Sequence, residues 1–438
     1  MQLKKLDNAL ILTFILAALL VRVPFLFIVP MVEAPDEYAH FWVTKFLSEN
    51  LTVPDAAQVA AGGPSAVYGS LPPFAYLPHV LFSHLIPGVD ISFSERIGSI
   101  LGGLVTVFAA CRISELLFAS NRVLRLALPM CVVLHPQFVF VNAYCNSDST
   151  ACAFASLLIW TSLVVIFRGP ELRYAAFAGI LCAFIALSKF SALAIVPVIF
   201  FAIMASSWIY RKTAVQTIAP LGLTALSAAL ICVPWFARNA AVFHGDWLGT
   251  ITMRDTWAKT FNRSIEPVSL SSVLKQKVWW QQLFCSFWAV FGYQKHYLPA
   301  GFYLAYFSMI LISSAGTFTQ ISQAVREKSI SFDFLRQLRE GDDVRLKHRA
   351  AWLSLWVCVA FSCAGLLYAA VQNLGGPQGR YLFPSEIAFM AIILSGLYGL
   401  NQKWGTRLVF VFVGLNGVTL IYSMILLYSM FGVRIKPY

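Results

Sequence analysis

The run ALILTFILAALLVRVPFLFIVP at residues 9–30 decides the class of the fold. It is longer than the ~20 apolar residues with which a helix crosses a hydrocarbon core of about 30 Å. Its one charged residue, Arg22, lies toward the distal end of the run. The run is too long for a signal peptide, and no small-residue cleavage site follows it. We therefore expect residues 9–30 to form a retained first membrane span.

The composition of the whole chain agrees with a membrane protein. Hydrophobic residues make up 59% of the 438 residues and charged residues only 12%, with a mean hydropathy of +0.72. An average soluble domain is about 25% charged, so this chain cannot cover its surface with polar groups in water. That excludes a soluble enzyme, a secreted disulfide module and a disordered regulator. The net charge of +12 comes from scattered basic residues, which does not indicate a nucleic-acid-binding patch.

Ten further apolar runs follow the first, so the sequence predicts an all-α integral membrane protein. We expect about eleven spans (10–13) in a single polytopic domain, residues 1–438. The run at 174–188 is the shortest. The predicted spans are Ala9–Pro30, Ile97–Ala119, Leu124–Ala143, Thr150–Phe167, Tyr174–Ser188, Phe190–Tyr210, Ala214–Phe236, Tyr297–Phe318, Ala350–Asn373, Leu382–Leu400 and Arg407–Phe431.

The distribution of Lys and Arg predicts the orientation of these spans. A cytoplasmic N-terminus leaves more than half of the 32 basic residues on the inside, including those of a basic loop at 320–349. Two long loops, 31–91 and 237–296, then lie outside. The first contains LPPFAYLPHVLFSHLIP (71–87), which is too short to cross and predicts an interfacial or re-entrant helix. The second contains WWQQLFCSFWAVFGYQKHY (279–297), an aromatic stretch suited to the headgroup level.

The sequence EAPDEYAH at 33–40 follows directly after the first span. Pro35 can open a helix, which places Asp36 and Glu37 in a first turn and His40 on the same face as Asp36. The charges could simply complement the helix dipole. They could equally supply a general base at the outer mouth of an apolar bundle.

Three other charged residues interrupt apolar sequence on the side predicted to be outside. Asp148 follows the third span, where it could simply cap the next helix. Lys189, in ALSKFSAL, lies between two apolar runs and could simply reach the headgroups. Arg380 follows a Gly/Pro-rich turn, where a guanidinium could clamp a phosphate with two parallel hydrogen bonds or anchor the chain at the interface beside Tyr381.

The order of these motifs resembles the GT-C class of membrane glycosyltransferases, in particular a bacterial branch with a P-D-E-x-x-H first outer loop and a late Q-G-R-Y motif. The resemblance extends over most of the chain. The motifs are PDEYAH (35–40), LPPFAYLPH (71–79), NSDS (146–149), SKF (188–190) and QGRYLFP (378–384). The first and the last of these five are the specific ones.

The resemblance implies an enzyme that takes a sugar from a polyprenyl-phosphate carrier and passes it, usually with inversion, to a glycan, lipid or protein acceptor outside the cytoplasm. It implies a location in the bacterial cytoplasmic membrane and a part in building cell-envelope polysaccharides. Through the P-D-E-x-x-H motif, the resemblance implies that Asp36 is the catalytic base and that Glu37 assists it. The implied substrate-binding residues are His40, Asp148, Lys189, Arg380 and Tyr381, with Arg380 and Lys189 holding the carrier phosphate.

No cofactor is predicted. A divalent metal is not favoured, because only Asp36, Glu37, His40 and Asp148 offer themselves as ligands. With the phosphate assigned to cations, we expect replacement of Asp36 to leave carrier binding nearly unchanged. Two other classes remain open: a flippase or transporter of lipid-linked sugars, and a membrane polysaccharide polymerase or ligase.

Overall fold

The computed structural model describes residues 6–86, 88–262, 266–326, 343–373 and 375–434. These residues are almost entirely helical, and nine helical segments among them are long and apolar enough to cross a membrane. The all-α membrane fold is therefore confirmed. The elements that contain these segments are α1 (Asn8–Ile28), α5 (Ile91–Leu117), α8 (Asp148–Arg168), η4 (Phe190–Ile195) with α10 (Pro197–Ile209), α11 (Ala214–Val242), α15 (Ala300–Arg326), α17 (Asp343–Val371), η5 (Gly379–Ser385) with α18 (Glu386–Gly399), and α19 (Gln402–Phe431).

The two other predicted spans are helical but shorter. The span predicted at 124–143 is divided into α6 (Arg122–Leu134) and α7 (Pro136–Val141). The break lies at His135, whose backbone is extended because the residue before a proline is disfavoured in the helical region. The span predicted at 174–188 is α9 (Leu172–Ala186), whose 15 residues extend over about 22 Å.

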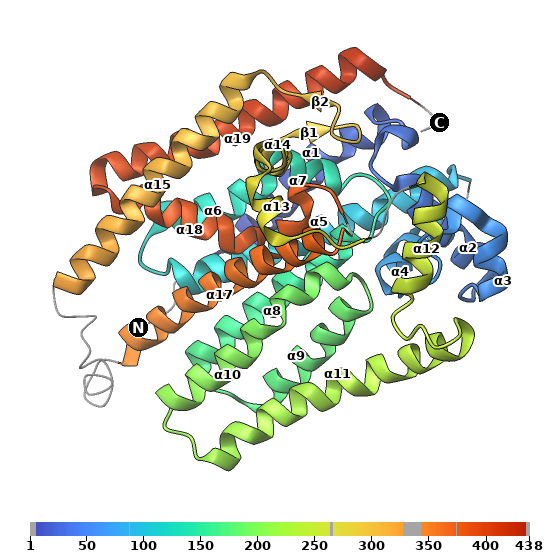
Figure 1. Cartoon of the computed structure of the whole chain (residues 1–438). Helices are drawn as coiled ribbons and strands as arrows, with labels where there is room; N and C mark the ends of the chain where they lie inside the picture. The colour runs from blue at the N-terminus through green and yellow to red at the C-terminus, as the bar shows by residue number, and fades with distance from the viewer. Residues whose placement is uncertain (1–5, 87, 263–265, 327–342, 374, 435–438) are drawn as a thin grey trace.

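The centre of the bundle is the packed pair α5 and α8, with α1 and α6 against α5, and α9 and α10 against α8 (Figure 1). Glycines permit the close approach of these helices. A Cβ atom at Gly102 of α5 would lie 2.6 Å from the carbonyl oxygen of Ser149 in α8. The start of α8, where Asp148 lies, is therefore fixed tightly against α5.

The two predicted outer loops fold into short elements. Segment 31–91 contains η1 (Met31–Glu33), α2 (Glu37–Asn50), α3 (Ala56–Gly62), η2 (Gly63–Ala66), η3 (Phe74–Tyr76) and α4 (Leu77–Leu85). Segment 237–296 contains α12 (Thr250–Phe261), α13 (Leu270–Lys275), α14 (Lys277–Trp288) and the hairpin of β1 (Val290–Phe291) and β2 (His296–Tyr297). Helices α2, α3, α4 and α12 gather at one end of the bundle, which we call the loop end (Figure 1).

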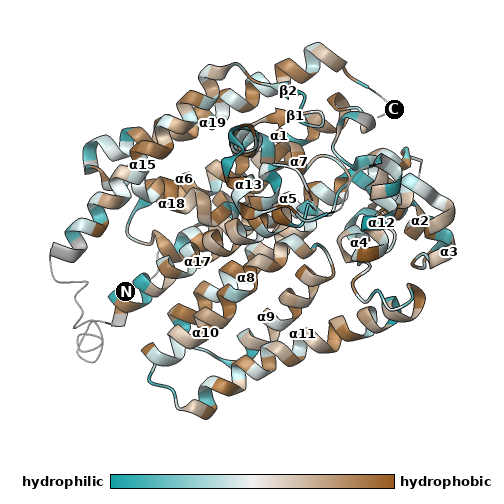
Figure 2. Cartoon of the chain, in the orientation of Figure 1, coloured by the Kyte–Doolittle hydropathy of each residue, from teal (hydrophilic) through white to brown (hydrophobic). Residues whose placement is uncertain are grey.

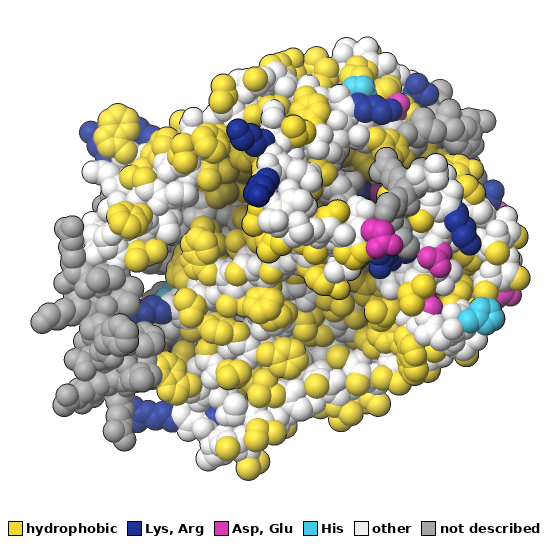
Figure 3. Space-filling model, in the orientation of Figure 1, with side chains coloured by type: hydrophobic (Ala, Val, Ile, Leu, Met, Phe, Trp, Pro, Cys, Tyr) yellow, Lys and Arg dark blue, Asp and Glu magenta, His cyan; other side chains and the backbone are white. Residues whose placement is uncertain are grey.

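The outer surface of the bundle is apolar. Leu226, Leu230 and Val233 of α11 are more than half exposed, although each is strongly hydrophobic. Figure 2 shows hydrophobic residues along the outer helices, and on the face in Figure 3 hydrophobic side chains cover the middle while acidic ones lie on the side of α12. Such a surface suits contact with lipid chains. The chain is a multi-pass membrane protein.

The predicted basic loop 320–349 lies largely outside the described residues. Helix α15 extends to Arg326, and α17 begins at Asp343. The basic residues predicted between them, Lys328, Arg336 and Arg339, belong to the part of the chain that the structure does not describe.

Candidate active site

Asp36 lies at the N-cap of α2 with a left-handed backbone, φ 61° and ψ 4°. Aspartate tolerates this conformation better than most residues, but it is still uncommon for a side chain with a Cβ. The backbone N–H of Asp36 donates to the Tyr293 hydroxyl at 3.2 Å, and its carbonyl accepts from the N–H of His40 at 3.1 Å. The PDEYAH motif is thus fixed on both sides of Asp36.

Arg380 faces Asp36 from the far end of the sequence. Its Nη2 donates to Oδ2 of Asp36 at 2.5 Å, and its Nη1 donates to the Tyr144 hydroxyl at 3.2 Å. Arg380 is 5% exposed, and it is carried by η5, which packs against α8 and α14. Gly379 makes this position possible, because a Cβ there would lie 2.2 Å from the backbone nitrogen of Phe287.

A second cation–carboxylate pair adjoins the first. The Lys189 Nζ donates to Oδ1 of Asp148 at 2.5 Å, and Oδ2 of Asp148 lies 3.8 Å from Arg380. The ring of Tyr381 lies beside both cations, with centroid distances of 5.4 Å to Lys189 and 5.8 Å to Arg380. The structure therefore brings five of the seven predicted site residues into one cluster, which we call the charge cluster: Asp36, Asp148, Lys189, Arg380 and Tyr381.

The charge cluster favours an ionised Asp36. Burial alone would raise the pKa of this carboxyl group, but the positive charges of Arg380 and Lys189 outweigh burial, and the pKa lies below its ordinary value. Asp36 is also the more accessible partner, with 31% of its side chain exposed against 6% for Arg380. A reachable carboxylate that is already ionised can accept a proton from a hydroxyl group.

His40 lies next to the charge cluster but makes its contacts elsewhere. Its Nδ1 is 2.6 Å from the Tyr76 hydroxyl, and its ring stacks on Tyr68 with centroids 4.6 Å apart. Burial lowers the pKa of His40 to about 3, against the opposing effect of Asp36. His40 is consequently a neutral, buried group over the physiological pH range.

Glu37 points away from Asp36 into the bundle. Arg96 of α5 holds it with two hydrogen bonds, Nε to Oε1 at 2.7 Å and Nη2 to Oε2 at 2.6 Å, and the Cys145 N–H donates to Oε1 as well. Both side chains of this pair are fully buried. The contacts of Glu37 are thus all with protein groups, and its assignment as a catalytic partner stays a prediction.

Sequence reasoning missed three residues that shape the site. Arg96 lies in the second turn of α5, Tyr144 precedes the NSDS motif, and Tyr293 lies in the aromatic stretch of segment 237–296. Each belongs to an ordinary apolar or aromatic context, and each contacts a motif residue far away along the chain. The nearness of Arg96 to the start of an apolar run was the only local signal.

The acidic groups of the site are engaged by cations rather than arranged for a metal. Among the residues that the structure describes, no group of three or more His, Cys, Asp or Glu side chains could hold a metal ion. Asp36 and Asp148 instead face Arg380 and Lys189.

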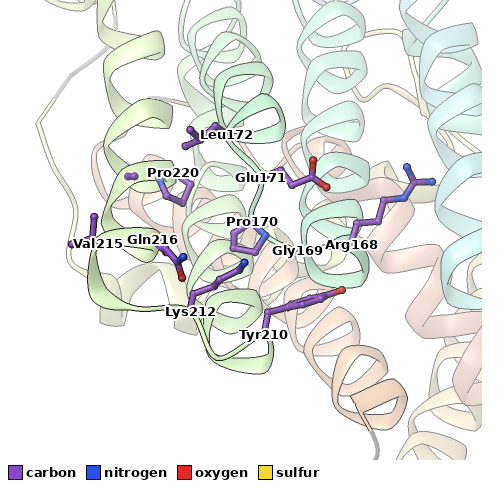
Figure 4. Close-up of a pocket in the computed structure, with 11 residues that line it drawn as sticks. Arg168, Gly169, Pro170, Glu171, Leu172, Tyr210, Lys212, Val215, Gln216 and Pro220 are labelled. Atoms are coloured by element: carbon purple, nitrogen blue, oxygen red, sulfur yellow. The ribbon is translucent and has the colours of Figure 1, made fainter.

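A pocket of about 520 Å³ lies at the opposite end of α8, away from the loop end. Figure 4 shows it between the ends of α8, α9, α10 and α11, where Arg168, Tyr210 and Lys212 line it. It contains none of the predicted site residues. The candidate active site is therefore the charge cluster and not this pocket.

Comparisons with known proteins agree on the architecture. Residues 71–237 match the profile of a family described as dolichyl-phosphate-mannose-protein mannosyltransferase. ArnT from Cupriavidus metallidurans, solved bound to undecaprenyl phosphate, is similar with a TM-score of 0.58 and 14% identity, over 97% of this chain and 65% of that one. The chain has the GT-C fold. The predicted resemblance to the GT-C class of membrane glycosyltransferases is therefore confirmed.

A second solved structure shares this GT-C fold. The archaeal oligosaccharyltransferase AglB from Archaeoglobus fulgidus, in complex with an inhibitory peptide and a dolichol-phosphate, gives a TM-score of 0.52 and 13% identity. It is matched over 97% of this chain and 56% of its own length, so the chain spans little more than half of AglB. A search of curated proteins finds no match.

Proposed function

We propose that this GT-C protein is an inverting glycosyltransferase that moves a sugar from a polyprenyl-phosphate donor to a hydroxyl group of an extracytoplasmic acceptor. The observation that carries the proposal is the charge cluster, in which an accessible, ionised carboxylate of Asp36 adjoins two cations, Arg380 and Lys189. Inverting transfer from a phosphate needs these two components: a base for the acceptor and positive charge for the leaving group.

In the proposed reaction, Asp36 takes the proton of the acceptor hydroxyl as that oxygen attacks the anomeric carbon. The bond between that carbon and the phosphate oxygen breaks, and its electron pair stays on the phosphate. Arg380 and Lys189 stabilise the added negative charge, which is worth most in a partly desolvated site. No acid is required, because phosphate leaves without protonation.

The resting site imposes an order on these events. Both cations are already engaged, Arg380 by Asp36 and Lys189 by Asp148. In this proposal a carrier phosphate competes with Asp36 for Arg380, so carrier binding depends on Asp36, unlike the expectation from the sequence that replacing Asp36 leaves it nearly unchanged. Once the phosphate draws Arg380 away, the pKa of Asp36 rises and the group becomes a stronger base. Donor binding thus activates the base.

Other observations support a lipid-linked donor in this proposal. ArnT was solved with undecaprenyl phosphate and AglB with a dolichol-phosphate, and the matching family is named for a dolichyl-phosphate sugar. The charged residues of the site lie at the loop end rather than at the middle of the spans, where transport sites usually lie. We place the charge cluster at the extracytoplasmic face of a bacterial cytoplasmic membrane.

The test uses the full chain in lipid nanodiscs with a panel of labelled undecaprenyl-phosphate sugars. Membranes of the source organism that lack this protein supply the acceptor. We expect one donor to transfer its label, and Asp36→Asn to lose at least ~99% of this rate. Full transfer by Asp36→Asn, or transfer of no label with any donor, contradicts the proposal.

A further inference from the structure

The tip of the β1–β2 hairpin touches Asp36 of the charge cluster and the loop that precedes Arg380. The Tyr293 hydroxyl accepts from the N–H of Asp36, and Nε2 of Gln294 donates to the Pro377 carbonyl at 3.0 Å, three residues before Arg380. In the same region, Ser286 of α14 accepts from the Gly379 N–H at 2.9 Å. Segment 237–296 thus bridges the PDE loop and the QGR loop, which are far apart in the sequence.

The backbone at this tip is held in an unfavourable conformation. Gly292, Tyr293 and Gln294 all have positive φ angles, of 59°, 47° and 63°. Glycine adopts such angles freely, but tyrosine and glutamine do so only where the surroundings enforce them. Asp36, the contact of Tyr293, is itself left-handed. The angles are those of a tight hairpin turn, which the hydrogen bond from the Lys295 N–H to the Gly292 carbonyl closes, and this turn fixes where Tyr293 points.

Tyr293 is the accessible aromatic group beside Asp36. It is 45% exposed, whereas Tyr144 and Tyr76, which also lie near the charge cluster, are almost completely buried. Its oxygen accepts the Asp36 N–H, so its own O–H remains available to donate. Burial, reinforced by the charge of Asp36, raises the pKa of Tyr293 and keeps this proton in place.

We infer that Tyr293 is an acceptor-contacting residue, and that the acceptor it selects is a hydroxyl group on a sugar ring. The exposed face of the phenol provides a platform for the apolar face of a sugar, and its O–H donates to an acceptor oxygen next to the carboxylate of Asp36. The same hydroxyl holds the Asp36 amide, so acceptor binding and base position are joined through one atom. The inference rests on the proposed function and names the acceptor side of that site.

The experiment compares Tyr293→Phe and Tyr293→Ala with the unmodified chain in nanodiscs. It uses the donor that the transfer test with the labelled panel identifies, and it titrates the acceptor membranes. Loss of the hydroxyl in Tyr293→Phe should raise the acceptor KM by about 3- to 10-fold. Loss of the ring in Tyr293→Ala should raise it by about 30-fold or more. The donor KM and the binding of undecaprenyl phosphate should stay unchanged in both variants.

Tyr297→Phe is the matched control, because Tyr297 lies on the same hairpin and is 39% exposed but touches neither Asp36 nor Arg380. It should keep the acceptor KM of the unmodified chain. An equal rise in donor and acceptor KM, or an unchanged acceptor KM in Tyr293→Ala, overturns the inference. The failure of this inference can be distinguished from the failure of the proposed function. If Tyr293→Ala keeps the normal acceptor KM while Asp36→Asn is inactive, only the acceptor role of Tyr293 is refuted.

Discussion

Two carboxylate–guanidinium pairs start from Asp36 and Glu37, which are consecutive residues at the beginning of α2. The two pairs differ in burial and in hydrogen bonding, the properties that matter for ligand binding. In the closed pair, Glu37 and Arg96 are both 0% exposed and joined by two parallel hydrogen bonds. In the open pair, Asp36 and Arg380 are joined through one carboxylate oxygen, and the Asp36 side chain is 31% exposed.

The remaining hydrogen-bonding groups make the difference clear. Arg96 also donates to the carbonyls of Leu26 and Val29 at the end of α1, so the closed pair ties α1, α2 and α5 together. In the open pair, Nε of Arg380 has no hydrogen-bond partner among the residues that the structure describes, and neither has Oδ2 of the neighbouring Asp148. Buried groups are normally satisfied, so unpaired ones next to an accessible carboxylate mark a place for a ligand. The closed pair therefore stabilises the fold, and in the proposed function the open pair is the one that contacts substrate.

The largest expected effect comes from breaking the closed pair. Arg96→Gln leaves Glu37 buried and unpaired, which should lower the free energy of unfolding by about 3–5 kcal/mol. Thermal unfolding in detergent or nanodiscs measures the loss. Arg380→Gln is the matched comparison, and it should destabilise the fold much less because its partner can reach solvent. Equal losses in the two variants would remove the distinction between the pairs.

Asp36→Asn tests the open pair in two opposite directions. Turnover should fall by a factor of ~10² or more because the base is gone. Binding of undecaprenyl phosphate should meanwhile tighten, by about 3- to 10-fold, because Arg380 loses its competing carboxylate. Isothermal titration with undecaprenyl phosphate measures the second effect. Weaker binding in this variant would falsify the competition between base and phosphate.

His40 follows Asp36 by one helical turn and behaves like the closed pair. Its pKa is lowered to about 3 by burial, whereas the unfolded chain takes up a proton near 6.5. Stability should therefore be lost as the pH falls below 6.5, by about 2 kcal/mol between pH 7 and pH 5. The stability of His40→Gln should lack this component when both proteins unfold across the same pH series. Parallel curves would mean that His40 is protonated in the fold.

The smallest expected effect is that of Arg380→Lys. The lysine keeps the charge but loses the planar fork, so transfer should slow by about 5- to 10-fold. A loss in kcat indicates contact with charge that develops on the leaving oxygen, and a rise in donor KM indicates equal contact with ground and transition states. Normal kinetics would reduce Arg380 to an interfacial anchor and leave Lys189 as the phosphate ligand.

The sequence was sufficient to predict the fold because each membrane span is a long run of apolar residues. Every run from 9–30 to 407–431 is helical in the structure, including the two that are too short to count among the nine long segments. The division at His135 required knowledge of one local proline effect. Helix lengths there depend on tertiary packing, which a run of apolar letters does not encode.

The sequence motifs assigned Asp36, Asp148, Lys189 and Arg380 to one site, and the structure brings these four side chains together. The pairing was not predictable, because 344 residues separate Asp36 from Arg380 and no local pattern couples them. Helical spacing also placed Glu37 beside Asp36 as a partner. The left-handed backbone at Asp36 turns the two carboxylates in different directions, and no sequence rule foresees that angle.

The length of helix α8 matches the thickness of the membrane core. Its 21 residues, from Asp148 in the charge cluster to Arg168 at the opposite pocket, extend over about 31 Å, which is close to the thickness of a hydrocarbon core. A carrier phosphate stays at the depth of the headgroups while its chain stays in the hydrocarbon. In the proposed function, the bilayer itself brings the phosphate to the level of Lys189 and Arg380, and lipid thickness becomes a determinant of how well donor and base align.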